Sequence, residues 1–127
     1  MAKYLSDEWI QSVNEALAGN EEVATATRGQ RVIIQQLVDG GPDGEHTSYL
    51  SIDDGTVTLV EGVAPDADVT VRTEYETSLA LQTGELDPMA AVMSGRIKPA
   101  GNLAKLMAVQ SAMSVVDELT KSVDTTF

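Results

Sequence analysis

The sequence predicts an α+β fold, in which helices cover a five-stranded, mainly antiparallel sheet. Three observations lead to this class: a helical apolar period near the N-terminus, four short segments rich in Val, Ile and Thr between turns, and a return to the helical period after residue 73. The 127 residues, 43% of them hydrophobic, suffice for one core and would make two domains too small. We therefore expect one domain over residues 1–127.

The N-terminal helix is expected over residues 5–19. Ser6 can cap its first turn, and acidic residues follow at the positive end of the helix dipole. The apolar residues that share one face are Ile10, Val13 and Leu17. The next segment, 21–30, is polar and rich in Thr, and we assign no element to it.

Residues 31–73 are predicted to form four strands, in the segments RVIIQQLV, TSYLSI, TVTLV and DVTVRT. The Asp54-Gly55 pair between two alternating runs signals a hairpin, because a tight turn needs positive φ and glycine adopts it at little cost. The other connections are also short. We therefore expect these strands to form an antiparallel meander.

Helices are expected again over residues 74–95. The first should end at Gly84, and the second should begin with Asp87 as its cap and Pro88 in its first turn. A fifth strand is expected over residues 96–101. Because Pro99 has no N–H to donate to a neighbouring strand, the fifth strand should lie at an edge of the sheet or end there.

The final helix is expected over residues 102–121, with Asn102 as its cap. Its broad apolar stripe predicts that one side packs on the core. The stripe consists of Leu103, Leu106, Val109, Met113 and Val116. The last residues, SVDTTF, are expected to fray.

The chain is strongly acidic, with 8 basic against 20 acidic residues and a net charge of −12. This balance argues against nucleic acid as a partner and against wholesale adsorption to an anionic membrane. No window approaches the roughly 18 apolar residues of a membrane span, so we expect no stable membrane insertion and a cytoplasmic protein. Without cysteine, neither a disulfide nor a thiolate metal site can form, and no cofactor is expected.

Catalytic motifs are not evident. Gly95 and Gly101 enclose five residues and lack the Lys-Ser or Lys-Thr that a phosphate-binding loop requires. His46 is the only imidazole, in a polar stretch that predicts an exposed loop. The paired aspartates at 53–54 and 66–68 are most simply turn formers, because they lack the spacing of a calcium loop.

Two features of the C-terminal third are unusual. Apart from Met1, every methionine falls between residues 89 and 113, where flexible side chains suit an irregular core or a site for ligands of varied shape. In addition, Arg96, Lys98 and Lys105 lie within ten positions that contain no acid. These cations could contact a carboxylate, a phosphate or a lipid headgroup, or could form a solvated face.

The order of motifs over about residues 47–116 resembles the sterol carrier protein type two family of sterol-binding, non-specific lipid-transfer domains. The most specific part is Gly84-Glu85-Leu86-Asp87-Pro88, followed by Met93-Ser94-Gly95-Arg96-Ile97-Lys98 and then Gly101-Asn102. The segment DADVTV before it is similar to the family's fourth-strand motif. The family's usual continuation of the last strand is replaced here by Pro99-Ala100.

The resemblance implies a sheet and helices that enclose a hydrophobic cavity, in which a small hydrophobic ligand such as a fatty acid, acyl-CoA, isoprenoid or sterol-like lipid binds without catalysis. Headgroup contacts would fall to Arg96, Lys98 and Lys105. The implied wall residues are Leu50, Leu79, Met89, Val92, Met93, Ile97, Leu103, Leu106, Met107 and Met113, with Trp9 as a further candidate.

Two other functions stay open. The same fold with a filled interior could serve as a protein interaction module, in which the Met-rich helix binds a partner. A cofactor-independent enzyme could use one buried carboxylate among Glu74, Glu76 and Asp87. The volume of the interior distinguishes the first alternative from a lipid carrier. The second would require an acid that faces a pocket and has a raised pKa.

Overall fold

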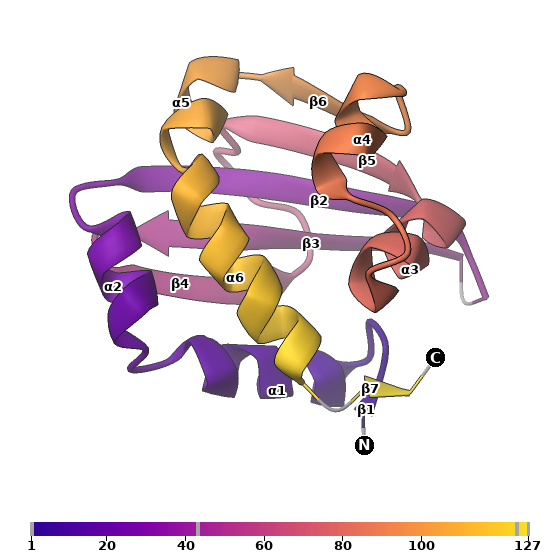
Figure 1. The fold of residues 1–127 in the computed structure, drawn as a ribbon, viewed down its shortest axis with the longest axis horizontal. Helices are drawn as coiled ribbons and strands as arrows, with labels where there is room; N and C mark the ends of the chain where they lie inside the picture. Colours follow the sequence, from indigo (N-terminus) through magenta and orange to yellow (C-terminus); the bar gives the residue numbers. More distant parts are fainter. Residues whose placement is uncertain (1, 43, 124, 127) are drawn as a thin grey trace.

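A computed structural model describes residues 2–42, 44–123 and 125–126, with the side chains of Ala2, Pro88, Met89 and Thr126 outside the description. In this part of the chain, five strands form one sheet in the order β4-β3-β2-β5-β6, and helices cover one of its faces (Figure 1). The predicted α+β class is therefore confirmed.

Helix α1 covers Asp7–Leu17 and begins as predicted, because the Ser6 side chain accepts a hydrogen bond from the Trp9 backbone N–H at 3.2 Å. Its acidic first turn suits the positive end of the helix dipole. The apolar face that the helical period predicts is buried. It consists of Trp9, Ile10, Val13 and Leu17.

A second helix, α2, covers Glu21–Thr27 in the segment to which the sequence assigned no element. Asn20 caps it by accepting from the Val23 N–H at 3.0 Å, and Val23 and Thr27 are buried one turn apart. The cap and two following glutamates are a helix-start signal. At 7 residues the helix is too short for its apolar period to be decisive.

Strands β2 (Arg31–Gly41), β3 (Gly44–Asp53) and β4 (Thr56–Glu61) pair in antiparallel order. The hairpin between β3 and β4 turns at Asp54-Gly55, where both residues have positive φ, 40° and 95°. The predicted hairpin is confirmed.

Strand β5 (Val69–Glu74) departs from the predicted meander, because it runs parallel to β2, with Ile34 beside Val69. The chain between β4 and β5 crosses the face of the sheet opposite to the helices. There the buried Gln35 side chain accepts a hydrogen bond from the Ala64 N–H at 2.7 Å. The meander was therefore wrong for its fourth strand. The free edge of β2 is paired only when β5 crosses to it.

Helix α3 (Tyr75–Thr83) ends at Gly84 in the left-handed conformation, and α4 (Pro88–Met93) begins with Asp87, whose side chain accepts from the Ala90 N–H at 3.2 Å. Both boundaries were predicted from the sequence, since glycine at a helix end and aspartate at a helix start are local signals.

Strand β6 (Ile97–Gly101) pairs antiparallel with β5 and lies at the edge of the sheet, as Pro99 predicts. Residues that pair across strands share a face, and alternate residues along a strand point to opposite faces. Ile97, which pairs with Thr73, therefore lies on the helix-covered face, and Lys98, which pairs with Arg72, lies on the other.

The final helix is divided into α5 (Leu103–Ala108) and α6 (Gln110–Ser122), and Asn102 caps α5 as predicted by accepting from the Lys105 N–H at 3.2 Å. The division falls at the fully buried Val109. Because of it, α5 contacts β2 and β5, whereas α6 packs against α1, α2 and α3. The single predicted helix is therefore wrong at this point.

The two ends of the described chain lie together (Figure 1). Strand β1 (Ala2–Lys3) pairs in parallel with β7 (Thr125–Thr126), and the Trp9 Nε1–H donates to Thr125 Oγ1 at 3.1 Å. The expectation that the C-terminal residues fray is wrong for Thr125–Thr126, because a partner from the N-terminus satisfies their backbone groups. Asp124 and Phe127 lie outside the described residues.

Most of the buried core lies between α1, α2, α6 and the β2–β4 half of the sheet. Side chains of Leu79, Leu106 and Met113 are partly buried and pack against this core from α3, α5 and α6. Fully buried members with large side chains include Val13, Val23, Val32, Ile34, Ile52, Val69 and Val109.

Candidate functional site

A first hollow, which we name the polar pocket, lies where β5 ends and α3 begins, and has a volume of about 530 Å³. Its lining contains three basic and three acidic side chains, so its charges balance. Arg72 Nη1 lies 3.5 Å from Asp39 Oδ2. Such a lining suits a small polar or charged group rather than an aliphatic chain. The lining residues are Asp39, Arg72, Thr73, Glu74, Glu76, Thr77, Ser94, Gly95, Arg96 and Lys98.

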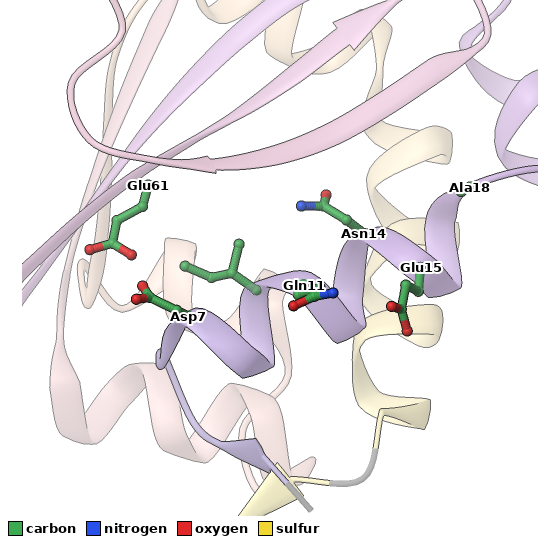
Figure 2. Close-up of a pocket in the computed structure, with 7 residues that line it drawn as sticks. Asp7, Gln11, Asn14, Glu15, Ala18 and Glu61 are labelled. Carbon is green, nitrogen blue, oxygen red and sulfur yellow. The ribbon is translucent and has the colours of Figure 1, made fainter.

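A second hollow, the α1 groove, has a volume of about 490 Å³ and is open to solvent between α1 and the end of β4 (Figure 2). Asn14 in this groove is already engaged, because its Nδ2 donates to the Leu59 carbonyl at 2.8 Å and its Oδ1 accepts from the Leu59 N–H at 2.7 Å. These bonds satisfy the backbone N–H and C=O of Leu59 on the edge strand β4. The lining residues are Asp7, Ile10, Gln11, Asn14, Glu15, Ala18 and Glu61.

Two titratable groups near the α1 groove have shifted pKa values. A hydrogen bond with the Asp7 side chain, and then the charge of Asp7, raise the pKa of Glu61. Burial lowers the pKa of His46, although the backbone of Leu5 and the Asp7 carboxylate favour the charged ring. Neither ring nitrogen of His46 has a hydrogen-bond partner among the described residues. The prediction that His46 lies in an exposed loop is therefore wrong. His46 lies in strand β3 and is half-buried beside the N-terminal segment that contains Leu5 and Asp7.

Replacing Glu61 with glutamine is expected to stabilise the protein near neutral pH by less than about 1 kcal/mol, because an exposed charge pair is screened by solvent. The pKa of Glu61 is raised in the folded state, so its favourable contribution is present in acid and is lost as the pH rises through that pKa. The gain should thus appear at about pH 7 and be absent at about pH 4. Urea denaturation at both values measures it. An equal gain at both would contradict a charge effect.

An apolar edge is formed by α4, β6 and α5 at the end of the sheet (Figure 1). We use this name for the side chains of Val92, Met93, Ile97, Leu103, Leu106 and Met107. Met93 is 82% exposed and Met107 is 72% exposed, while Ile97 and Leu106 are half-buried. Large apolar side chains so incompletely covered on neighbouring elements are characteristic of binding surfaces.

The other implied wall residues are more deeply placed. Leu50 on β3 and Trp9 on α1 are buried members of the core. Leu79 on α3 and Met113 on α6 are partly buried and pack against this core, as Leu106 of the apolar edge also does. The side chain of Met89 lies outside the described residues.

The three predicted headgroup cations are not brought together. Arg96 and Lys98 line the polar pocket, whereas Lys105 Nζ forms an ion pair with Asp68 Oδ1 at 2.9 Å. Asp68 also accepts from the Ile33 N–H at 2.9 Å, and this bond, followed by the bond from Lys105, lowers the pKa of Asp68. Sequence reasoning missed Arg72, which joins the pocket because β5 pairs with β6. Only the register of these strands shows that.

The carboxylates proposed for an enzyme are exposed: Glu74 and Glu76 line the polar pocket, and Asp87 caps α4. Among the described residues, no three His, Asp or Glu side chains are grouped as metal ligands. Within the same part of the chain, every helix is too short or too polar to cross a membrane.

Known proteins are similar to this chain in sequence and in fold. Residues 13–114 match the model of the SCP-2 sterol transfer family. A sterol carrier protein 2 from Rattus norvegicus is 31% identical over 75 residues, which are 58% of this chain and 14% of the relative. The chain thus spans about one seventh of the length of that curated relative.

Two solved structures have the same fold at low identity. A conserved hypothetical protein from Thermus thermophilus, described as possibly a sterol carrier protein, has a TM-score of 0.78 and 20% identity, over 99% of this chain and 93% of that one. The palmitated SCP2L2 of Aedes aegypti has a TM-score of 0.61 and 22% identity, over 87% and 94% of the chains. Because the family match covers most of the sequence and the fold agrees, the chain belongs to the SCP-2 sterol transfer family.

Proposed function

We propose that this protein binds a lipid with a long aliphatic part, such as a fatty acid, an acyl-CoA, an isoprenoid or a sterol-like molecule, and does so without catalysis. The lipid would lie against the helix-covered face of β5 and β6. Its neighbours there would be Leu79, Ile97, Leu106 and Met113. Membership of a sterol transfer family and the palmitated relative with the same fold support a lipid as the ligand.

The observation that carries the proposal is the contrast between the two halves of the molecule. On α1 the apolar face is buried, whereas the described large apolar side chains of α4, β6 and α5 are all at least partly exposed. Folding normally covers such surface because each buried CH₂ group contributes about 0.8 kcal/mol. An aliphatic chain bound beside α4, β6 and α5 would bury the apolar surface that folding leaves exposed there.

The composition favours an aliphatic ligand over a stacked ring system. The chain contains one Trp, three Tyr and one Phe, and the buried Trp9 is in edge-to-face contact with Tyr4 in the core. The proposed site is instead surrounded by Leu, Ile and Met, which adapt to flexible chains. The polar pocket includes Arg96 at the junction between α4 and β6, and Arg96 would contact a charged end of the ligand, whereas Lys98 lies on the opposite face of the sheet.

Displacement of a fluorescent fatty acid tests the function. Replacing Ile97 with serine is expected to weaken binding about tenfold, because about half of an Ile side chain's apolar contact is lost. Replacing Ala100 with serine is the matched control, since Ala100 lies on the same strand but on the opposite face, paired with Thr70. Its affinity should stay within about twofold of the parent.

Two results would overturn the proposal. The parent protein could fail to bind any fatty acid, prenyl lipid or sterol in a broad panel, or Ala100→Ser could weaken binding as much as Ile97→Ser does. A panel that stays empty would favour the interaction module with a filled interior.

A further inference from the structure

The polar pocket contains more charged groups than the charged end of the proposed lipid would engage. It lies at the end of the sheet where β5 leads into α3 and α4 leads into β6 (Figure 1). Of its six charged side chains, Arg72 and Asp39 form an ion pair. Among the described residues, the other four have no opposite charge within the 4.0 Å of an ion pair. These four are Arg96, Lys98, Glu74 and Glu76.

The strand register sorts the charges on the uncovered face of the sheet into two rows. Arg72 of β5 pairs with Lys98 of β6, which gives a basic row, and Asp39 of β2 pairs with Glu74 of β5, which gives an acidic row. The rows are two residues apart along β5, or about 7 Å. Like charges directly opposite each other destabilise a sheet. An anion beside the basic row and a cation beside the acidic row would relieve both repulsions.

Two buried hydroxyl groups extend the lining. Thr73 is 9% exposed and Thr77 is 7% exposed, and both line the pocket. Among the described residues, neither hydroxyl has a hydrogen-bond partner, yet neither oxygen is sealed from solvent. Buried polar groups normally have a partner, which a polar ligand in the pocket would supply. Thr73 lies on the helix-covered face, so the pocket reaches round the end of β5 and is larger than the two rows.

We propose that the polar pocket binds a small, water-soluble zwitterion with a primary ammonium and a carboxylate, which is an amino acid in the broad sense. The carboxylate lies beside the basic row, where Arg72 and Lys98 donate charge-assisted hydrogen bonds. The ammonium lies beside the acidic row and donates to Glu74. The Glu74 side chain is available for this bond, because it stands at the start of α3 without capping the helix.

The lining selects the type of cation. Quaternary ammonium groups are typically recognised by aromatic rings, and none of the described residues that line the pocket is aromatic. A primary ammonium instead carries three N–H donors, which carboxylates accept. The balance of three basic and three acidic side chains also favours a ligand with balanced charge, since a ligand of one sign would leave one row without a counter-charge.

This inference goes beyond the proposed function, since the ligand is water-soluble and the two rows lie on the face opposite to the proposed lipid site. Arg96 stays available for the charged end of a lipid. The two ideas fail separately, because zwitterion binding is measured without lipid. An empty lipid panel would leave this inference standing, and failure of the zwitterion to bind would leave the lipid proposal standing.

Titration of the protein with γ-aminobutyrate tests the inference, with the backbone amide NMR signals of Gly95 and Arg96 as the readout. γ-Aminobutyrate should shift both signals and bind about tenfold or more tightly than three matched probes. Butyrate lacks the ammonium, butylamine lacks the carboxylate, and γ-butyrobetaine has three methyl groups in place of the N–H donors.

Substitutions test the two rows. Glu74→Gln and Lys98→Gln each keep the side chain polar and remove one charge, and each should weaken binding of γ-aminobutyrate about tenfold. Asp53→Asn and Arg31→Gln are the matched controls, because they remove one charge each from an exposed ion pair at the far end of β2, and affinity should stay within about twofold.

Four results would overturn the proposal. γ-Aminobutyrate could fail to shift the two signals, butyrate or butylamine could bind as tightly as γ-aminobutyrate, or the control variants could weaken binding as much as the pocket variants. In the fourth, phosphatidylethanolamine shifts the signals and γ-aminobutyrate does not, which would assign the pocket to a lipid headgroup.

Discussion

Replacing Gly101 with alanine is expected to lower the free energy of unfolding by about 3 kcal/mol or more. Gly101 has φ of +110°, a conformation that residues with a Cβ atom rarely adopt, and an added Cβ would lie 2.6 Å from the Asp68 carbonyl oxygen. That oxygen also accepts from the Asn102 N–H at 2.8 Å. The clash is with the backbone of Asp68 and Val69, which cannot move aside as a flexible side chain could, so β6 and α5 must separate from β5.

Gly62→Ala provides the matched control. Gly62 has a similar φ of +118°, and an added Cβ would meet nothing within 4 Å. It should therefore lose only the conformational part, about 1 to 2 kcal/mol. Urea denaturation measures both, with a lower midpoint at an unchanged slope as the expected sign of a pure stability loss. If the two variants were equally stable, the added Cβ at position 101 would not clash with the Asp68 backbone. The close approach of β6 to β5 would then not require glycine.

Replacing Gln35 with glutamate is expected to destabilise the protein by about 3 to 5 kcal/mol near neutral pH, because it buries a charge that faces carbonyl oxygens. Gln35 is 5% exposed. Its Nε2 donates to the carbonyls of Ser48 at 2.7 Å and Gly62 at 3.1 Å, and its Oε1 accepts from the Ala64 N–H. A carboxylate keeps the last bond and loses both donors.

The pH dependence of this variant has a definite sign. Burial and the facing carbonyls would raise the pKa of the introduced glutamate above its unfolded value of about 4.3, so protonation favours the folded state. The loss of stability should therefore shrink as the pH falls through the raised pKa. A protonated carboxyl can donate one of the two missing hydrogen bonds, so the recovery is partial.

Urea denaturation at about pH 7 and about pH 5, referred to the parent at each pH, measures this effect. Gln110→Glu adds the same charge at the exposed first residue of α6 and should change stability by less than about 0.5 kcal/mol. Gln35→Met, which removes the bonds without adding a charge, should fall between them. A loss at Gln35→Glu no larger than at Gln110→Glu would mean that Gln35 does not hold the β4–β5 connection on the sheet.

Much of the fold follows from signals within a few residues. The caps at Ser6, Asp87 and Asn102 and the turn at Asp54-Gly55 can be read from the chain because their hydrogen bonds and φ angles are local. Pro99 likewise placed β6 at an edge, since its missing N–H is a property of the residue itself.

The residues of the candidate site remain a prediction from the sequence, and their exposure could not be predicted at all. The resemblance named residues of α4, β6 and α5, and the apolar pattern of a helix shows which face is apolar. How far neighbouring elements cover that face depends on where they pack. Leu106 thus lies against the core, whereas Met107, the next residue, is exposed to solvent.

Local chemistry in the chain therefore settles the type and the ends of most helices and strands, and with them the α+β class. Contacts between distant segments decide the parallel pairing of β5 with β2, the bend at Val109, the pairing of the two termini, and the meeting of Arg72 with Lys98. The physical reason is that a cap or a turn is satisfied by its own neighbours. A free strand edge or an apolar face can be satisfied by several partners, and only packing of the whole chain selects one.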